Sequence, residues 1–273
     1  MFDDIDIRLC ADFPDVLIMN NNIAIRLVDI HKSFGNQKVL DGINLEIEEG
    51  KTTVIIGKSG GGKSVLLKHI IGLLKPDKGE IWIDGVEITK LNERDLNAIR
   101  RKFGMLFQEA ALFDSMDVFD NVAFPLREHT KMTDREIRAI VEDRLKEVGL
   151  PDVSEKIPSE LSGGMRKRVG LARALVLDPD IILFDEPTSA LDPVISLTIL
   201  DLIKETRTHF QKTYLVISHD ILGMFRIADK VAMLSNGRII EYGTPVEIRQ
   251  SNNETTREFL RATRIPGFAG GDR

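Results

Sequence analysis

The most informative segment of this 273-residue chain is Gly57-Lys58-Ser59-Gly60-Gly61-Gly62-Lys63-Ser64, which matches the pattern G-x-x-x-x-G-K-[ST]. A β-branched run at 52–56 predicts a buried strand before it, and the apolar pattern of 64–71 predicts a helix after it. The glycines let successive backbone N–H groups point inward at the helix N-terminus, where the dipole favours an anion. Lys63 would then reach the β- and γ-phosphates, and the Ser64 hydroxyl could bind Mg²⁺. This order of elements predicts a nucleoside triphosphate site rather than a flexible glycine turn.

Composition and charge narrow the class of protein. A hydrophobic share of 42% and a charged share of 29% are ordinary for a globular chain with one large domain or two closely packed ones. The net charge of −6, without a dense Lys/Arg run, argues against a nucleic-acid partner. Cys10 is the only cysteine, which excludes an intrachain disulfide and favours a reducing compartment. Because the start is acidic and no window of about 18 apolar residues exists, we expect a soluble, cytoplasmic protein.

Apolar periodicity predicts strands and helices with one helical insertion. Strands are predicted at 23–28, 43–47, 80–83, 103–107, 181–184 and 214–217, with a hairpin at 230–243. Helices are predicted at about 93–101 and 134–148 and from 245 onward. From about 109 to 160 the β-branched runs disappear, which predicts a helical insertion rather than an independent domain. Residues 16–19 could add an edge strand, and the glycine-rich end after 267 predicts a mobile tail.

Polar residues follow two of the predicted strands, as the glycine loop follows a third. Asp185 and Glu186 come directly after 181–184, and His219 follows 214–217. Three strands that end in polar residues at one sheet edge suggest a shared crevice. Beside a phosphate-binding loop we expect an acid in the Mg²⁺ shell and a base next to it. A lone histidine at a strand end is otherwise more often a capping residue.

Two further segments have both a structural and a functional interpretation. Ser162-Gly163-Gly164 opens a predicted helix and could present backbone N–H groups to an anion, or serve as a helix cap alone. Phe34 stands in a predicted turn at 33–36 and could offer a flat face to a purine ring, or fill the core as a hydrophobic plug. The residues themselves leave both pairs of alternatives open.

Taken together, these motifs resemble the ATP-binding subunit of ABC transporters over residues 23–245. The segments 57–64 and 181–185 are similar to Walker A and Walker B. The other matching motifs are the Q-loop at Gln108, the signature at Leu161-Ser162-Gly163-Gly164-Met165, the catalytic glutamate at Glu186, the D-loop at 189–192 and the switch histidine at His219. Phe34 falls where the family places an adenine-stacking aromatic, although Tyr is more usual there.

The resemblance implies a fold and a domain organisation. The fold class would be α/β, a P-loop ATPase core with a mixed sheet, an N-terminal antiparallel β subdomain and a helical signature subdomain. Residues 1–22 would be an N-terminal extension and 23–245 the ATPase domain, with its helical subdomain at about 109–165. Residues 246–273 would form a C-terminal helix and tail.

The resemblance also implies how the chain acts. Two subunits would stack head to tail as a homodimer, with each ATP between one Walker A and the partner's Ser162, Gly163 and Gly164. Phe34 and the segment 57–64 would complete the nucleotide contacts. The implied cofactors are ATP and Mg²⁺, and the implied metal ligands are Ser64, Gln108 and Asp185. The implied catalytic residues are Glu186, which orients the attacking water, His219, which braces the γ-phosphate, Lys63 and Gln108.

The segments around Gln108 indicate a branch of the family. Residues 104–108, 111–115, 121–130 and 162–168 look like the Mla-type branch, whose bacterial ATPases serve a lipid permease that works with an MCE-domain protein. This resemblance implies an integral membrane permease, an MCE-domain substrate-binding subunit and a small STAS-like cytoplasmic subunit as partners, at the cytoplasmic face of the inner membrane. Residues after Gln108 would form the groove for the permease's coupling helix. The alternative is that they only pack the helical insertion.

Other functions remain as alternatives. An importer of polar amino acids or another small solute would use the same ATPase chemistry. A soluble ABC-type ATPase acting on DNA or ribosomes is disfavoured, because the chain has no long heptad segment and only one ATPase unit. A simple kinase or GTPase is disfavoured as well, because neither needs residues 161–165.

Overall fold

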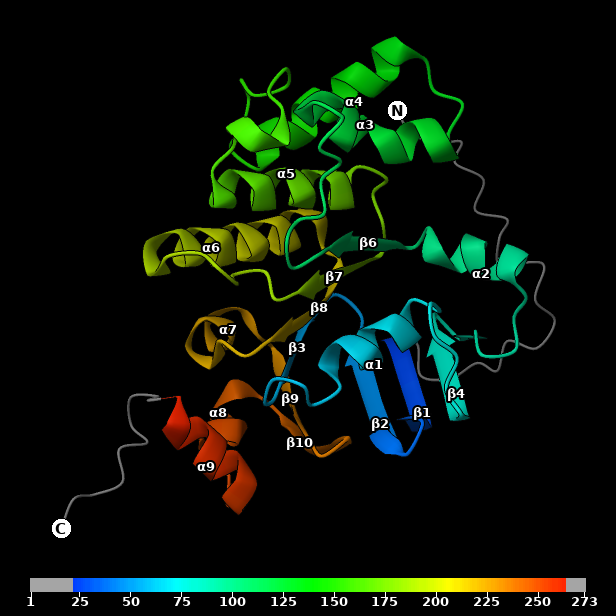
Figure 1. Cartoon of the computed structure of the whole chain (residues 1–273), viewed down its shortest axis with the longest axis vertical. Helices are drawn as coiled ribbons and strands as arrows, with labels where there is room; N and C mark the ends of the chain where they lie inside the picture. The colour runs from blue at the N-terminus through cyan, green and yellow to red at the C-terminus, as the bar shows by residue number, and fades with distance from the viewer. Residues whose placement is uncertain (1–21, 264–273) are drawn as a thin grey trace.

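The computed structural model describes residues 22–263, which fold around two β-sheets (Figure 1). The predicted edge strand at 16–19 and the predicted tail after 267 lie outside the described residues. Between residues 22 and 263, no helix has both the length and the apolar character that crossing a membrane requires.

The smaller sheet is antiparallel and has the strand order β2-β1-β4-β5. Its strands are β1 (Ile23–Phe34), β2 (Gln37–Glu48), β4 (Lys78–Ile83) and β5 (Val86–Glu87). β1 and β2 are longer than the sequence pattern predicted, because their polar ends pair as well: Ser33 lies opposite Lys38, and Phe34 lies opposite Gln37. Alternation of apolar residues could not reveal this part, since the pairing of β1 with β2 shifts register between Leu27 and Ile30 and again after Lys32.

The larger sheet has six strands in the order β10-β9-β3-β8-β7-β6. They are β3 (Thr52–Ile56), β6 (Phe103–Leu106), β7 (Ile181–Asp185), β8 (Thr213–Ser218), β9 (Lys230–Ser235) and β10 (Arg238–Gly243). Five of them run parallel, and β10 pairs antiparallel with β9. This sheet and the antiparallel one confirm the predicted α/β class with a mixed core sheet.

Helices cover both faces of the larger sheet. They are α1 (Lys63–Ile70), α2 (Glu93–Arg100), α3 (Val118–His129), α4 (Asp134–Glu147), the 3₁₀ helix η2 (Pro158–Glu160), α5 (Gly163–Leu175), α6 (Pro193–Phe210), α7 (Ile221–Ile227), α8 (Pro245–Arg249) and α9 (Glu254–Ala262). The single helix predicted from 245 onward is two short helices. Ser251 separates them, because its hydroxyl donates to Glu241 and accepts the backbone N–H of Asn253, the residue that caps α9.

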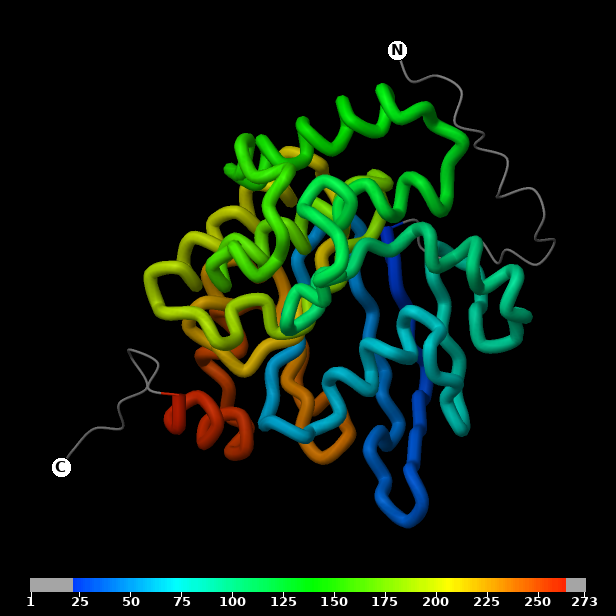
Figure 2. Tube along the Cα trace, turned by 45° about the horizontal axis from the view of Figure 1, so that its top comes forward, coloured from blue at the N-terminus to red at the C-terminus, as the bar shows by residue number. Residues whose placement is uncertain are grey.

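The insertion between β6 and α5 begins with a loop and then becomes helical. Residues 109–117 form a loop and not a helix. Buried Asn121 of α3 holds this loop, because its side-chain oxygen accepts the Phe113 N–H at 2.8 Å. Its amide nitrogen donates to the backbone carbonyl oxygens of Phe113, Met116 and Asp117. α3 and α4 then pack on α5. Figure 2 shows this helical segment (green) at the end of the molecule opposite the β1–β2 hairpin (dark blue).

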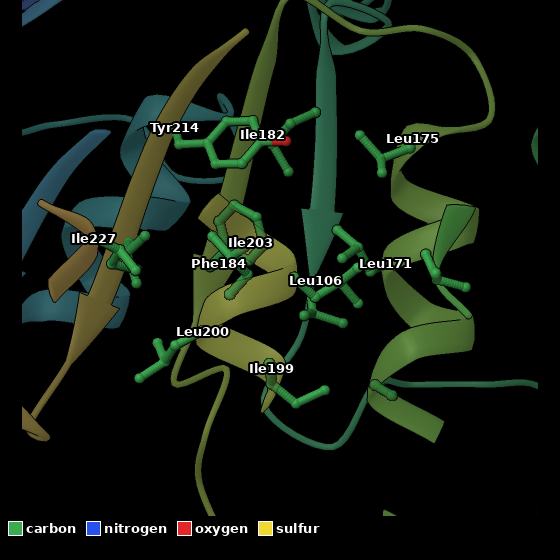
Figure 3. Close-up of a cluster of buried hydrophobic side chains, with 14 of the residues drawn as sticks. Leu106, Leu171, Leu175, Ile182, Phe184, Ile199, Leu200, Ile203, Tyr214 and Ile227 are labelled. Atoms are coloured by element: carbon green, nitrogen blue, oxygen red, sulfur yellow. The ribbon is translucent and has the colours of Figure 1, made fainter. Parts of the chain in front are cut away.

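The larger sheet separates two hydrophobic cores, because successive side chains of a strand point to opposite faces. Ile182 and Phe184 of β7 belong to the core under α3–α7, together with Tyr214 of β8 (Figure 3). Ile181 and Leu183 of the same strand belong to the other core, which also contains apolar residues of α1, α2 and the smaller sheet. α1 and α5 therefore lie on opposite faces of the larger sheet.

We expect Phe184→Ala to be among the most destabilising core substitutions. Phe184 is fully buried, and its ring centroid lies 5.1 Å from that of Tyr214. Removing the ring leaves a cavity beside β7, and the expected loss is about 3–5 kcal/mol of unfolding free energy. Chemical denaturation would measure it. As a control, Val194→Ala on α6 removes an exposed side chain and should stay within about 0.5 kcal/mol of the wild type. Equal effects of the two substitutions would contradict the packing described here.

Candidate functional site

The glycine loop lies between β3 and α1 and closely approaches two other strands. A Cβ on Gly57 would lie 2.3 Å from the Leu234 carbonyl oxygen of β9, so no larger residue fits. Gly62 caps α1 with a φ of +97°, and a Cβ there would lie 3.0 Å from the Val39 carbonyl oxygen of β2. These two glycines fix the loop against both sheets. The N-terminus of α1 therefore opens into the concave side of the loop, where backbone N–H groups and the helix dipole favour an anion.

Lys63 points its ammonium group back at the loop. Nζ donates to the carbonyl oxygens of Gly57 at 2.9 Å and Lys58 at 3.2 Å. Burial lowers the pKa of Lys63, while the carboxylates of Glu186 and Asp185 act in the opposite direction. A buried cation held only by carbonyl dipoles is a strong site for phosphate oxygens, which would replace those carbonyls as partners.

Asp185 and Ser64 bring two oxygens together across the loop. Asp185 ends β7, and its Oδ1 accepts from the Ser64 hydroxyl at 3.4 Å. Burial raises the pKa of Asp185, and the neighbouring Glu186 raises it further. A divalent cation would relieve both effects, and Mg²⁺ typically takes one or two carboxylates plus phosphate oxygens and water. The two residues fit Mg²⁺, although no group of three His, Cys, Asp or Glu residues in the described chain could hold a metal alone.

Glu186 is held in a strained and well-oriented position. Its φ is +50°, a left-handed conformation that costs a non-glycine residue about 1–3 kcal/mol and is typical of functional sites. The Glu186 N–H donates to the Ile217 carbonyl at 2.9 Å. Its Oε2 accepts from the Ser218 hydroxyl and the His219 N–H, both at 3.3 Å, and lies 2.8 Å from His219 Nδ1. The ends of β7 and β8 thus form one carboxylate–histidine pair, which can accept a proton from water.

The signature residues serve their own helix as a cap. Ser162 Oγ accepts the Met165 N–H at 3.3 Å, so Ser162 is a helix cap, and its role toward an anion stays a prediction. A Cβ on Gly164 would lie 2.6 Å from Ile195 Cγ2, so the helix start packs closely on α6. Because α5 and α1 lie on opposite sheet faces, the structure does not place Ser162–Gly164 in the glycine-loop pocket of the same chain.

Phe34 does not fill the core. It ends β1 with 48% of its surface exposed, and Lys32 Nζ lies 5.8 Å from its ring centroid. The plug interpretation is therefore wrong, and one ring surface is available to a flat ligand. Gln108 is exposed as well, and its backbone carbonyl oxygen accepts hydrogen bonds from Lys167 of α5 and from the Ser189 hydroxyl.

Two contributors to the site were missed by sequence reasoning. Lys167 is buried and donates to the carbonyl oxygens of Gln108 and Glu186, the latter at 3.2 Å. Ser218 supports the Glu186 carboxylate. In the sequence, Lys167 belongs to the segment 162–168 and stands between two arginines, so no local signal distinguishes it from the exposed Arg166 or the partly exposed Arg168.

Comparison with known proteins agrees with this geometry. The family described as ABC transporter matches residues 40–189, more than half of the chain. The Mycobacterium leprae protein named probable ribonucleotide transport ATP-binding protein mkl is 44% identical, over 90% of this chain and 71% of that protein. The intermembrane phospholipid transport system ATP-binding protein MlaF of Haemophilus influenzae is 43% identical, over 89% of this chain and 92% of that protein.

Solved structures agree too. The dimeric post-hydrolysis structure of the ATP-binding cassette MJ0796 bound to ADP and Pi matches with a TM-score of 0.74 and 34% identity, over 81% of this chain and 98% of that one. The chain therefore belongs to the ABC transporter family and is an ATP-binding, ATP-hydrolysing subunit. The resemblance inferred from the sequence motifs is confirmed at this level.

We expect Phe34→Ala to weaken ATP binding because Phe34 presents an exposed ring at the end of β1. Base–aromatic stacking contributes about 1–3 kcal/mol, so Kd should rise roughly 5- to 150-fold. Phe34→Tyr keeps the ring and should change Kd little. Isothermal titration calorimetry would measure both variants. An unchanged Kd for Phe34→Ala would remove Phe34 from the nucleotide site.

Proposed function

We propose that ATP binds over the glycine loop and is hydrolysed at the edge formed by β3, β7 and β8. Residues 57–64 take the phosphates, Lys63 pairs with the β- and γ-phosphates, and Phe34 stacks on the adenine. Ser64 and Asp185 would hold Mg²⁺, with Gln108 as a further ligand. The ion supplies charge neutralisation for the phosphates. The raised pKa of Asp185 and the exposed ring of Phe34 support these assignments.

Glu186 is the proposed base for the attacking water. The water oxygen bonds to the γ-phosphorus, the bond to the β–γ bridging oxygen breaks, and the released proton passes to Glu186. His219 lies 2.8 Å from the same carboxylate, where it can orient Glu186 and brace the γ-phosphate. The Ser218 hydroxyl and the His219 N–H both donate to one oxygen of the Glu186 carboxylate and so fix its orientation. This supports the view that positioning of the base contributes most of the rate enhancement.

A second copy of the chain would complete each site. Ser162, Gly163 and Gly164 begin α5 on the sheet face opposite α1, which supports a role of their N–H groups at the γ-phosphate of another subunit. ATP brings about four negative charges, which Lys63 and one Mg²⁺ offset only in part. Helix-terminal N–H groups from a partner would supply further stabilisation. The homodimer is therefore the form that we propose to be active.

We expect Glu186→Gln to bind ATP nearly as well as the wild type but to lose turnover by about 10²–10⁴-fold, as for the loss of a positioned base. The amide keeps the shape of the side chain, while Ser64 and Asp185 remain in place. This trapped variant should dimerise when ATP is added, and sedimentation would detect the dimer.

Ser162→Arg in the Glu186→Gln background provides the control. The new side chain blocks only the partner's phosphate, so the dimer should be lost while the monomer still binds ATP. A Ser162→Arg single variant that hydrolyses ATP normally as a monomer would overturn the shared-site proposal.

A groove beside the Q-loop suits a membrane permease. Its volume is about 800 Å³, and its lining contains the apolar Met105, Phe107, Phe113, Phe124 and Pro125. Arg100, Arg101, His129 and Arg173 are also among its lining residues, which include no acidic residue. We infer that this groove, which the segment after Gln108 helps to form, receives the coupling helix of an integral membrane permease at the cytoplasmic face of the inner membrane.

The transported molecule that we propose is a phospholipid, moved between bacterial membranes. The observation that carries this proposal is the similarity to a protein named for intermembrane phospholipid transport, which extends over 92% of that protein. An MCE-domain subunit and a STAS-like subunit are the further partners that we propose. A small-solute importer is the second candidate, and the relative named for ribonucleotide transport favours it.

Purification of the tagged chain from membranes would test the transported molecule. We expect a permease and an MCE-domain protein to be recovered with it. Vesicles containing that complex should transfer fluorescent phospholipid in an ATP-dependent way, and the same complex with Glu186→Gln should not. Recovery of a solute-binding protein, with ATP-dependent uptake of ribonucleotide or amino acid and no lipid transfer, would favour the second candidate instead.

A further inference from the structure

One face of α5 contacts residues 108–111, the segment that follows β6. Lys167, Gly170 and Arg173 are spaced three residues apart and therefore share a helix face. Arg173 donates to the carbonyl oxygens of Ala110 at 2.6 Å and Ala111 at 2.8 Å. Gly170 allows close packing, since a Cβ there would lie 2.7 Å from Leu106 Cδ1. The Q-loop segment is thus held to α5 at several points.

Lys167 differs from the other two residues because it also reaches the loop 186–192 between β7 and α6, which we call the catalytic loop. Its Nζ donates to the carbonyl oxygen of Gln108, to that of Glu186 at 3.2 Å and to Ser189 Oγ at 3.5 Å. Ser189 in turn donates to the Gln108 carbonyl at 3.4 Å. An ammonium group has three N–H donors, and here each has a partner. One side chain therefore joins the Q-loop to the catalytic loop, both at Glu186 and at the D-loop residue Ser189.

The buried environment of Lys167 makes its ammonium group depend on these three oxygen partners. The residue is 5% exposed, and an isolated charge at such a position is strongly unfavourable. Three oxygens compensate for the burial, and the carboxylates of Glu109, Asp185 and Glu186 add favourable charge at longer range. The left-handed backbone of Glu186 also needs support from its surroundings, and Lys167 contacts the carbonyl group of that same residue.

We propose that Lys167 is a positioning residue that links the start of α5 to Glu186 of the same chain. Lys167 lies five residues after Ser162, so a displacement of the α5 N-terminus on engaging a partner's phosphate is carried to Glu186, Gln108 and Ser189. In the dimer on which the proposed function rests, this link couples the two ATP sites. ATP bound at one site would thereby determine the position of the Glu186 carboxylate at the other site.

A purely structural role predicts something different. If Lys167 only fastened α5 to the segment after β6, Gly170 and Arg173 would largely compensate for its loss, and any remaining loosening would appear along α5 itself. The link to Glu186 and Ser189, by contrast, has no substitute on that helix face. If Lys167 is a positioning residue, its loss should loosen residues 186–192 and lower kcat. If its role is only structural, its loss should loosen α5 itself.

Lys167→Met and Lys167→Arg test the proposal in the full-length protein. Lys167→Met should leave Kd for ATP within about threefold but lower kcat by about 10²-fold, the size expected for a catalytic group displaced by about 1 Å. The Hill coefficient for ATP should fall from roughly two to roughly one. Lys167→Arg retains charged N–H donors and should recover most of kcat. If Lys167→Met does not fold, Lys167→Gln replaces it and should show the same direction of change.

Arg168→Met is the matched control. Arg168 is on the same helix but donates to the Val148 carbonyl at 3.3 Å, at the end of α4 and away from the catalytic loops. This variant should keep the wild-type kcat and Hill coefficient. A similar loss in Arg168→Met and Lys167→Met would show that any disturbance of α5 has this effect, and would overturn the proposal.

Hydrogen–deuterium exchange tests, without an activity measurement, whether Lys167 holds the Q-loop and the loop that begins at Glu186. In Lys167→Met, peptides covering 107–111 and 186–192 should exchange faster, while the middle of α5 should exchange as in the wild type. Faster exchange along α5 alone, or no change at 186–192, would overturn the proposal. A wild-type Hill coefficient near one would count against the proposed dimer, whereas the exchange result would still decide whether Lys167 holds Glu186.

Discussion

Parallel pairing of β3, β8 and β7 is the constraint on which the site depends. The register places Ile56 beside Ser218 and Asp185 beside Ile217, so the chain leaves all three strands at one edge of the sheet. The glycine loop, the two carboxylates and His219 meet there although they come from distant parts of the chain. Each strand is buried on both faces, so a slip in register would move polar strand ends toward the apolar cores and displace the site residues from one another.

The edge concentrates buried charge, and the fold balances it with backbone dipoles. Burial lowers the pKa of Lys63 and of Lys167 and raises that of Asp185. Both lysines donate mainly to carbonyl oxygens, of the glycine loop in one case and of the Q-loop and catalytic loop in the other. At Lys63 this balance favours the polyanion that we propose, because phosphate oxygens would replace weak dipolar partners with full opposite charges, whereas Lys167 keeps its carbonyl partners.

The arrangement of the two cores supports the proposal that one chain alone is an incomplete catalyst. Strand residues alternate between the faces, so α1 packs in one core and α5 in the other. The helix terminus that begins at Ser162 is therefore separated by the sheet from the terminus that begins at Lys63. Yet α5 also contacts the catalytic loop through Lys167. In the dimer that we propose, α5 would face a partner's nucleotide at its N-terminus and contact Glu186 of its own chain through Lys167.

The sequence by itself determined the elements whose signals are local. The glycine loop, the strands ending at Asp185 and Ser218, the capping Ser162 and the α/β class follow from spacing, periodicity and capping chemistry, which act within a few residues. Only the tertiary structure decided the full length of β1 and β2, the exposure of Phe34 and the contacts of Lys167. Those depend on cross-strand pairs and on contacts between residues far apart in the chain, for example Gln108 and Lys167, whose numbers differ by 59. No local pattern records such contacts, because the energy that selects them arises only when the elements pack.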